Sequence, residues 1–508
     1  MIEVHPVHRN SRTFPGLFYA VLILITAIYY ILLVTDGKLD LFTPFDPFMR
    51  WGMAFNSMLE HLRHGEFDVD AAAIGFEGCV RDGKTYTYFG IFPALLRFPL
   101  LLTGTLARLD VTRLYCALAA VVALCFKLAS LALINDKLPK GRLQAVAFFV
   151  ILLSLLLGGA QIQFLNKGSI YQETIDWAGA IAAAFVYCGV RGLIAKREFS
   201  TGLIAAVAGL AGLGLLSRAS TALGLYVATG LLVLVLAWPP AGSLGDRLPR
   251  FVRALTNTRT VVGIAILLGF IMVSGIVNYQ RWGDPLKFFY DPHTYITYKM
   301  MPERLARLEA HGVFNIDRLW YGMLYYFSPI WAIIRPDGQF LFSEFETRML
   351  DGVEPPPSSF LLSDPLLLVL GGAFLFQLPR LARERLLDFR AAAALTIGFS
   401  IPVFLILTFF YMGFRYRMEF YPFLEFTAFL GFYATCVNPA QLSALWRSRL
   451  SLILIASAGF GIIYSHFALL LYKISPFTYW VSVPDGWVDL YLTQLKLIFP
   501  SIAQRLHL

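Results

Sequence analysis

The chain has 508 residues, of which 57% are hydrophobic and only 15% are charged, and its mean hydropathy is +0.64. Apolar runs of about twenty residues recur along the whole length, which is the pattern of helices that cross a bilayer. This composition excludes an ordinary soluble globular protein and predicts an all-α polytopic membrane protein. The formal net charge of +9 follows from the topology described below and does not require nucleic-acid binding.

The N-terminal segment carries Arg9 and Arg12 ahead of an apolar run, and no small-residue cleavage site follows that run. These features predict an uncleaved first span rather than a signal peptide. Four of the five cysteines lie inside apolar runs and only Cys79 lies in a long polar loop. No disulfide framework is therefore expected.

The apolar runs predict eleven spans, and the basic residues between them predict the topology. Short cytoplasmic connections of membrane proteins are enriched in Lys and Arg. With the N-terminus inside, the inner segments hold eighteen basic and six acidic residues, whereas the first outer loop holds eight basic and ten acidic residues. We therefore expect the N-terminus in the cytoplasm and the C-terminus outside. The predicted spans are 14–34, 114–135, 143–160, 177–194, 201–216, 220–238, 260–278, 361–378, 391–411, 420–437 and 450–472.

Two of the predicted outer loops, 35–113 and 279–360, are much longer than a connection between spans requires. Loops of that length are usually functional. The chain accordingly divides into a transmembrane module over 1–478, which includes both loops, and an outer amphipathic tail over 479–508.

The first outer loop contains two apolar stretches that are too short to span a membrane. From Phe48 to Leu62, apolar residues recur at helical spacing with polar residues between them, which predicts an amphipathic helix lying in the membrane interface. The stretch 89–102 is interrupted by two prolines and by Arg97, and it predicts a second interfacial helix. If 89–102 crossed the membrane instead, all later spans would be inverted, and the distribution of basic residues argues against that topology.

Several stretches in the outer loops and at neighbouring span ends share residue patterns with a known superfamily. They are "DPFMRWGMAFNSMLEHLRHGEFDVD" and "DGKTYTYFGIFPALLRFP" in the first loop, "SIYQETIDW" in the next outer loop, "NYQRWGDPLKFFY" at the start of the late loop, and "FRYRMEFYPFL" at the start of a late span. Their order and common outer placement resemble the GT-C superfamily of integral-membrane glycosyltransferases. The similarity is to the bacterial branch of protein O-mannosyltransferases and lipid A aminoarabinose transferases.

The resemblance implies an inverting glycosyltransferase of the bacterial inner membrane. Such an enzyme moves a sugar from a polyprenyl-phosphate donor to a lipid, glycan or protein acceptor on the outer face. Its partners are the donor, the acceptor and membrane lipids. Two other functions stay open: a transporter or flippase of a lipid-linked sugar, and a polymerase or ligase of diphosphate-linked glycans. Transporters more often show paired halves, and no such pairing is visible in this sequence.

Transfer with inversion requires a base for the acceptor hydroxyl. The resemblance places Asp46 in that role, with Asp40 in reserve. Asp46 immediately precedes Pro47, and an Asp followed by a Pro is also a common helix start, so a capping role stays open. The two roles are compatible, because a carboxylate at a helix start is held rigidly.

The pair Asp68 and Asp70 offers carboxylate oxygens to a divalent metal ion, which is the cofactor that the sequence admits. Such pairs are also frequent in ordinary loops. Glu77 and Asp82 share this ambiguity. The eight histidines show no metal-binding spacing, and His61 is expected on the polar face of the first interfacial helix.

A lipid phosphate requires cations as negative charge develops on it. Arginine suits this task because its planar donors engage two oxygens at once. The alternative for residues at span ends is that they reach lipid headgroups. The candidates for phosphate and substrate binding are Arg415, Tyr416, Arg417, Arg218, Arg281, Lys84, Tyr171 and Glu173. Glu173 is either a ligand for substrate hydroxyls or a solvated surface carboxylate.

Two ionisable residues, Lys127 and Glu425, lie within apolar runs. Charged groups are rare inside membrane spans and usually face a cavity or a partner. We therefore expect a partner or a cavity beside each of them, with Glu425 on the outer side.

Overall fold

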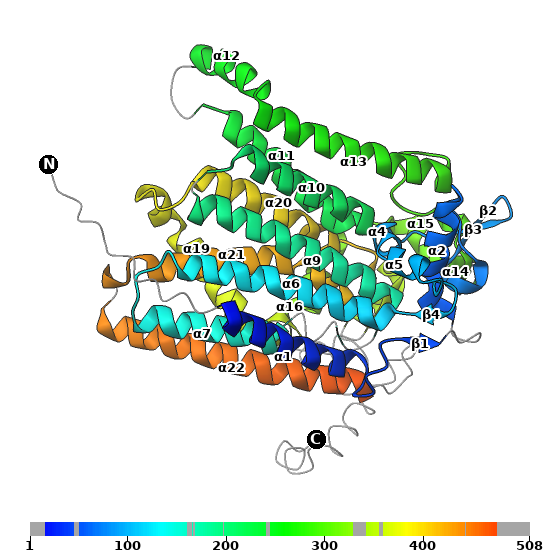
Figure 1. Cartoon of the computed structure of the whole chain (residues 1–508), viewed down its shortest axis with the longest axis horizontal. Helices are drawn as coiled ribbons and strands as arrows, with labels where there is room; N and C mark the ends of the chain where they lie inside the picture. Colours follow the sequence, from blue (N-terminus) through cyan, green and yellow to red (C-terminus); the bar gives the residue numbers. More distant parts are fainter. Residues whose placement is uncertain are drawn as a thin grey trace, which may run out of the picture.

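The computed structural model describes residues 16–44, 50–159, 165, 168–196, 198–239, 244–328, 342–354, 359–441 and 443–474. Long helices run side by side in one bundle, and short helices and strands gather at one end of it (Figure 1). We call this the loop end, because it carries the described parts of 35–113 and 279–360. The other end carries the connections that the sequence predicts to be cytoplasmic.

Each of the eleven predicted spans coincides with a long helix. Among the described residues, nine helices are long and apolar enough to cross a membrane. The other two, α7 and α10, have 16 and 17 residues. The helices are α1 Gly16–Val34, α6 Thr112–Asn135, α7 Arg142–Leu157, α9 Ile170–Val190, α10 Thr201–Ser217, α11 Ala219–Ala237, α13 Thr258–Trp282, α19 Pro365–Arg383, α20 Phe389–Leu407, α21 Tyr421–Val437 and α22 Ala444–Ile474. The all-α membrane fold predicted from the sequence is thus confirmed.

The bundle is packed around α9 and α21, almost all of whose residues are buried. Close packing of helices in membranes depends on small residues at their contacts. A Cβ added to Gly431 in α21 would lie 1.9 Å from the carbonyl oxygen of Leu370 in α19. A Cβ added to Gly398 in α20 would lie 2.4 Å from Ala228 in α11. These glycines let two helix pairs approach to backbone contact.

The first loop forms short elements at the loop end. Its predicted amphipathic helix is present as η1 and α2, and α2 buries Phe55, Met58 and Leu59. That apolar face packs against Phe89 and other protein residues, so it does not lie on lipid as expected. The predicted second helix is present as α4 and α5. The elements are β1 Thr43–Pro44, η1 Arg50–Met53, α2 Ala54–Arg63, α3 Ala71–Ile74, η2 Gly75–Glu77, β2 Cys79–Arg81, β3 Lys84–Tyr86, α4 Phe92–Leu95, α5 Phe98–Leu102 and β4 Leu109–Asp110.

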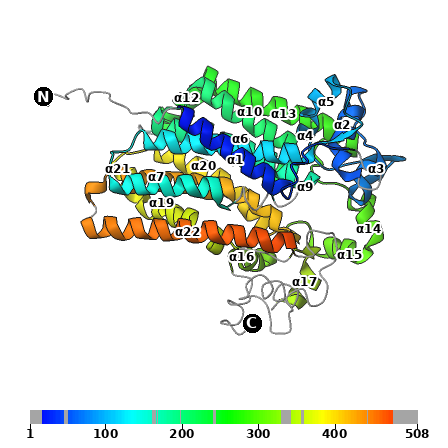
Figure 2. The ribbon, with the colours of Figure 1, turned by 60° about the horizontal axis from the view of Figure 1, so that its bottom comes forward.

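Several large apolar side chains of α4 and α5 face outward, unlike those of α2, whereas Pro93 and Ala94 are buried. Leu95, Phe98 and Leu102 are 45%, 54% and 74% exposed. Both helices lie at the side of the loop end, near α10 (Figure 2). Exposed apolar side chains next to a bundle of membrane-spanning helices fit the predicted interfacial position of 89–102.

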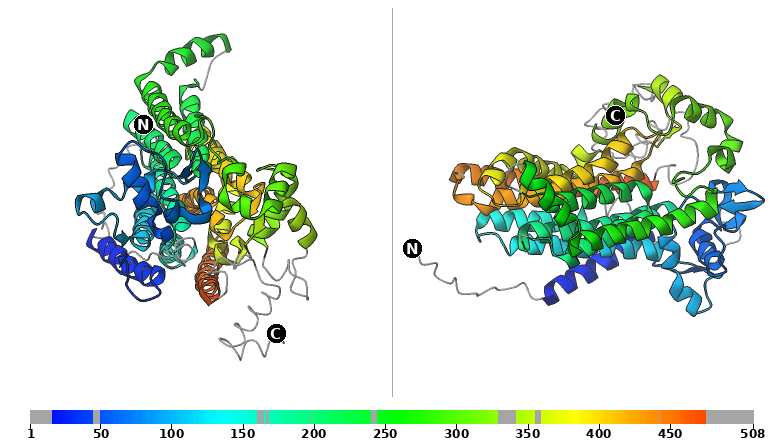
Figure 3. Two further views of the ribbon diagram at one scale, coloured as in Figure 1. Left: turned by 90° about the vertical axis from the view of Figure 1, so that its right-hand side faces the viewer. Right: turned by 90° about the horizontal axis from the view of Figure 1, so that it is seen from above.

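The second loop packs against the first. Cys79 and Tyr295 form an isolated antiparallel bridge, and the amide of Ile296 donates to the carbonyl oxygen of Gly78 at 3.0 Å. Seen from the loop end, the two loops lie on neighbouring sides (Figure 3, left). The described elements are η4 Pro292–Thr294, α14 Ile296–Met300, α15 Pro302–His311, η5 Ile316–Arg318, α16 Leu319–Phe327, α17 Ser343–Met349, β5 Gly352–Val353 and α18 Phe360–Ser363.

Three small sheets hold these segments in register. β1 pairs antiparallel with β4, and β2 pairs antiparallel with β3. β5 pairs in parallel with β6 (Tyr411–Met412), which connects the second loop to the segment before α21. That segment continues as the 3-10 helix η7 (Phe414–Glu419). At the other end, α12 (Leu244–Leu255) precedes α13, the π-helical turn η3 (Arg191–Ala195) follows α9, and η8 (Pro439–Gln441) precedes α22.

Candidate functional site

A partly exposed arginine, Arg415, lies at the loop end in η7. Its guanidinium carbon is 4.9 Å from the ring centre of Tyr171, 5.3 Å from that of Tyr411 and 5.3 Å from that of Tyr416. Its Nη1 forms an ion pair with Glu354. The Arg415 side chain is 17% exposed and that of Glu354 is 25% exposed. The guanidinium is therefore oriented by three rings, and part of it faces solvent.

The position of Glu354 follows from strand pairing. The parallel pairing of β5 with β6 places Gly352 opposite Tyr411, and the amide of Glu354 donates to the carbonyl oxygen of Met412 at 2.8 Å. The Glu354 carboxylate then accepts from the amide of Phe414 at 2.9 Å and from the hydroxyl of Tyr411 at 3.1 Å. The second loop thus supplies the counterion of Arg415.

A second arginine, Arg218, lies at the junction of α10 and α11. Its guanidinium carbon is 5.1 Å from the ring centre of Tyr416, so Tyr416 contacts both arginines. Arg218 Nε donates to Glu419 at 2.5 Å, and the side chain is 21% exposed. Glu419 is buried and also accepts from the hydroxyls of Ser220 and Thr221 at 2.6 and 2.7 Å.

Tyrosines surround a buried carboxylate next to Arg415. The hydroxyls of Tyr88 and Tyr295 donate to Glu77 at 2.5 and 2.7 Å, and Tyr171 also interacts with Glu77. Burial, followed by the charge of Glu77, raises the pKa of Tyr88 and Tyr295 far above the usual range. The two phenols therefore stay protonated and act as donors. Glu77, predicted as an ambiguous metal ligand, instead accepts from Tyr88 and Tyr295 and interacts with Tyr171, which is one of the three rings around Arg415.

Four of the predicted binding residues meet at this place: Arg415, Tyr416, Arg218 and Tyr171. They come from η7, from the α10–α11 junction and from the first turn of α9. Two cations, hydroxyl donors and aromatic faces at the loop end can hold a phosphate and orient a sugar.

The other predicted cations lie elsewhere. Arg417 is buried and donates to Asp364 at 2.9 Å and to the hydroxyl of Ser363. Arg281 is buried and donates to the carbonyl oxygen of Phe89 at 2.8 Å. For both, the requirement to pair a buried guanidinium explains the residue without a substrate.

Lys84 and Glu173 also lie apart from Arg415. Lys84 pairs with Glu66 at 3.3 Å. Glu173 is fully buried, and its two oxygens accept from Arg97 at 2.7 and 2.6 Å. Both predicted alternatives for Glu173, a hydroxyl ligand and a solvated carboxylate, are therefore replaced by a buried salt bridge.

Of the two carboxylates predicted as catalytic bases, Asp40 belongs to the described part of the chain. Asp46 lies outside the described residues. Asp40 forms an ion pair with Arg113, and its side chain is 35% exposed. The C-terminal tail over 479–508 also lies outside the described residues.

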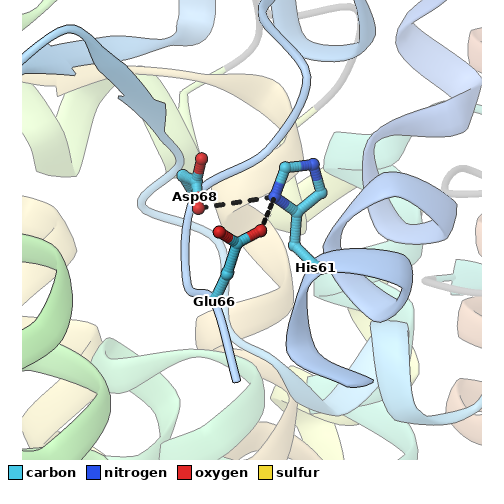
Figure 4. A group of neighbouring side chains, drawn as sticks. All are labelled: His61, Glu66 and Asp68. Atoms are coloured by element: carbon cyan, nitrogen blue, oxygen red, sulfur yellow. Dashed lines mark ion pairs between the residues drawn. The ribbon is translucent and has the colours of Figure 1, made fainter. Parts of the chain in front are cut away.

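A separate polar group lies between the end of α2 and the following segment (Figure 4). His61 Nδ1 is 3.5 Å from a Glu66 oxygen and 3.4 Å from a Asp68 oxygen. Asp70, predicted together with Asp68 as a metal-binding pair, lies instead on the other side of the imidazole, 3.6 Å from Nε2. The structure therefore adds His61 and Glu66 to Asp68 as possible metal ligands.

Sequence reasoning missed four residues of these sites. Glu354 and Glu419 gave no signal, because each is brought to its arginine by contacts over 61 and 201 residues. His61 and Glu66 were visible in "HLRHGEFDVD", but their spacing matches no common metal motif. A partner or a cavity was expected beside each of the charges within apolar runs, Lys127 and Glu425. The structure pairs them with each other, with Lys127 Nζ 2.5 Å from Glu425 Oε1, so each of the two buried charges neutralises the other.

No family model matches the chain, and no curated protein matches it. Among solved structures, the fold is similar to that of the oligosaccharyltransferase of Archaeoglobus fulgidus. The apo form aligns at 14% identity with a TM-score of 0.48, over 90% of this chain and 56% of that chain. Its complex with an inhibitory peptide and a dolichol-phosphate aligns at 15% identity with a TM-score of 0.44, over 90% and 56%. Its complex with Zn and sulfate aligns at 14% identity with a TM-score of 0.46, over 88% and 53%. This chain thus spans little more than half the length of those proteins.

Proposed function

We propose that the protein is an inverting glycosyltransferase that moves a sugar from a polyprenyl-phosphate donor to a lipid, glycan or protein acceptor. The observation that carries the proposal is the pair of partly exposed arginines, Arg415 and Arg218, which both contact the ring of Tyr416 at the loop end. In this arrangement, the prenyl chain of the donor lies in the lipid beside the helix bundle, and the phosphate of the donor binds to these cations at the loop end.

The two arginines differ in how firmly they are held. Arg218 is bound by Glu419, which is itself buried and accepts from two further hydroxyls. Arg415 is paired with Glu354, which is 25% exposed. A guanidinium has five N–H donors, and the Glu354 pair uses Nη1. Arg415 can therefore donate to a phosphate while it stays oriented by its rings, and Arg218 adds a fixed positive charge.

In the proposed reaction, the acceptor hydroxyl attacks the anomeric carbon and the sugar–phosphate bond breaks. Negative charge then develops on the leaving phosphate, where Arg415 and Arg218 stabilise it. We propose Asp46 as the base that takes the hydroxyl proton, with Asp40 in reserve. The loop end would face the periplasm of a bacterial inner membrane, with the N-terminus in the cytoplasm, because the other end carries most of the basic connections.

The proposal is tested with purified protein in liposomes and labelled polyprenyl-phosphate sugars, measuring release of the sugar from its carrier. Loss of one preorganised donor lowers kcat by about 10²–10³-fold, so Arg415→Gln should fall by about that factor. Arg415→Lys should recover part of the rate, because it keeps the charge and loses the planar fork. Asp46→Asn should be inactive. Lys137→Gln, an exposed cation at the other end, is the matched control.

Different outcomes separate the alternatives. Undiminished transfer by Asp46→Asn would remove Asp46 as the base. Wild-type rates in Arg415→Gln would remove the phosphate role of Arg415. Movement of labelled lipid across the bilayer without release of the sugar would identify a flippase and overturn the glycosyltransferase proposal.

A further inference from the structure

We propose that His61, Glu66 and Asp68 form a binding site for a divalent transition-metal ion of the Zn²⁺ type. The site lies at the C-terminal end of α2 and on the segment that follows it (Figure 4). It is formed by the first loop alone and shares no residue with the Arg415 cluster. The proposal therefore stands independently of the proposed glycosyltransferase activity.

The distances fit a tetrahedral ion. With bonds of about 2.0–2.2 Å, neighbouring ligand atoms of a tetrahedral Zn²⁺ site are about 3.3–3.6 Å apart. His61 Nδ1 is 3.5 Å from Glu66 Oε2 and 3.4 Å from Asp68 Oδ1. All three ligand atoms lie within 4.8 Å of one another. Glu66 is 46% exposed, so its side chain can close the remaining edge and leave a fourth position for water.

The His61 imidazole presents a buried nitrogen to the two carboxylates. Nδ1 is a buried atom of a side chain that is 20% exposed, and within the described part of the chain it makes no hydrogen bond, although two carboxylates lie beside it. Buried polar atoms are nearly always paired, so an unpaired nitrogen aimed between two carboxylates indicates a missing partner. Imidazole nitrogen and carboxylate oxygen are both ligands of Zn²⁺ in proteins.

The surroundings also fit a metal-bound histidine. Metal-binding histidines usually face a carboxylate or carbonyl with their other ring nitrogen, which orients the ring. Here Asp70 Oδ1 lies 3.6 Å from His61 Nε2. Asp70 is itself positioned by Ser57, whose hydroxyl donates to Asp70 Oδ2 at 2.9 Å and accepts from the Asp70 amide at 2.8 Å.

The ammonium of Lys84 lies beside both carboxylates of the proposed site. Its ammonium is 3.3 Å from Glu66 Oε1 and 3.5 Å from Asp68 Oδ1, where it neutralises part of the negative charge. The Lys84 side chain is 48% exposed, so it can turn into solvent. A metal ion and Lys84 would compete for the same carboxylates. Removal of the lysine should therefore strengthen metal binding, which a simple surface salt-bridge network would not do.

A bound ion would fasten the end of α2 to the segment 66–70. That segment is joined to the hairpin β2–β3 by the Val69 amide, which donates to the carbonyl oxygen of Thr85 at 2.8 Å. The ion would thus tie α2 to the hairpin, and metal should raise the melting temperature of the whole protein by mass action.

The test uses the full-length protein without a histidine tag, stripped with EDTA, in detergent. Zn²⁺ alone is titrated by calorimetry, bound metal is counted by mass spectrometry, and Co²⁺ reports tetrahedral geometry by its visible absorption. The wild type should bind one ion. His61→Gln and Glu66→Gln should each weaken binding by more than about tenfold. Lys84→Met should tighten it. His64→Gln, a neighbouring exposed histidine outside the group, is the matched control and should bind as the wild type does.

Three results would overturn the proposal: equal binding by His61→Gln and His64→Gln, unchanged or weaker binding by Lys84→Met, or a preference for Mg²⁺ over Zn²⁺. If His61→Gln fails to fold, the exposed Glu66→Gln and the gain expected from Lys84→Met still decide the question. Sugar release is measured on the same variants, and its loss or retention bears on the proposed function alone.

Discussion

One buried ion pair joins the first loop to the bundle, and breaking it should destabilise the protein strongly. Arg97 and Glu173 are both fully buried, and their bidentate contact has distances of 2.7 and 2.6 Å. Arg97 Nε also donates to Asn56 at 3.1 Å, and its guanidinium carbon lies 4.1 Å from the ring centre of Tyr115. Arg97→Met removes all of these contacts and leaves a carboxylate without its counterion.

The magnitude follows from the burial. Removal of one partner from a buried ion pair costs about 3–5 kcal/mol, and the lost ring contact adds about 1 kcal/mol. Glu173→Gln should cost a similar 3–5 kcal/mol, because Arg97 then stays charged without a carboxylate. The double variant removes both charges, so its loss should be smaller than the sum. The expected coupling energy lies within the range of about 1.5–7 kcal/mol measured for close charge pairs.

The assay is a thermal melt of purified wild type, both single variants and the double variant in the same detergent. An unfolding entropy of about 2.1 cal/mol/K per residue gives about 1.1 kcal/mol/K for 508 residues, so Arg97→Met should lower Tm by about 4–6 °C. A shift below about 1 °C, or strictly additive single shifts, would refute the reasoning. Lys137→Gln again serves as the control.

Two further predictions concern the second loop and the helix packing. Burial raises the pKa of Glu346 to about 7; the hydrogen bond from Tyr321 acts in the opposite direction but has the smaller effect. The folded protein then holds this proton to a higher pH than the unfolded chain does, so the stability of the fold decreases as pH rises from about 4.5 to about 7. Glu346→Gln should make the melting temperature depend less on pH over this range. An unchanged pH dependence would exclude this carboxyl as its source. Gly431→Ala should lower Tm, because the added Cβ would lie 1.9 Å from the Leu370 carbonyl oxygen. Gly459→Ala is the control: its Cβ would meet no described atom within 4 Å, so its Tm should stay the same or rise slightly. Equal melting temperatures of the two variants would contradict the packing argument.

The spans were predictable because an apolar run of sufficient length has few alternatives to a membrane helix. The ends of the helices were less predictable. The fourth span was predicted to begin at residue 177, whereas α9 begins at Ile170. Its first turns contain Glu173 and Asp176, and both side chains are buried. A hydropathy pattern assigns such polar residues to a loop, since it does not reveal the partner that Arg97 provides from another segment.

The same limit applies to the first loop. Helical spacing predicts α2, and the amphipathic pattern puts the polar residues of that stretch, Asn56 among them, on the side away from the apolar face. Asn56 is in fact buried and donates to the carbonyl oxygens of Leu106 and Leu109 at 2.7 and 2.8 Å. Arg97 was interpreted as an interruption of an apolar stretch, although it is a fully buried structural residue. Spacing along one helix carries no information on contacts that a neighbouring segment makes.

Exposure separates four of the arginines, Arg97, Arg417, Arg415 and Arg218, into two groups with different roles. Arg97 and Arg417 are 0% and 1% exposed, and their carboxylate partners are as deeply buried, so no ligand reaches them without unfolding the local structure. Arg415 and Arg218 are 17% and 21% exposed and lie on the same tyrosine ring. Only Arg415 also has a partly exposed partner, Glu354. A phosphate that displaced Glu354 would meet a guanidinium already oriented by three rings, and this is why we place the donor phosphate at Arg415.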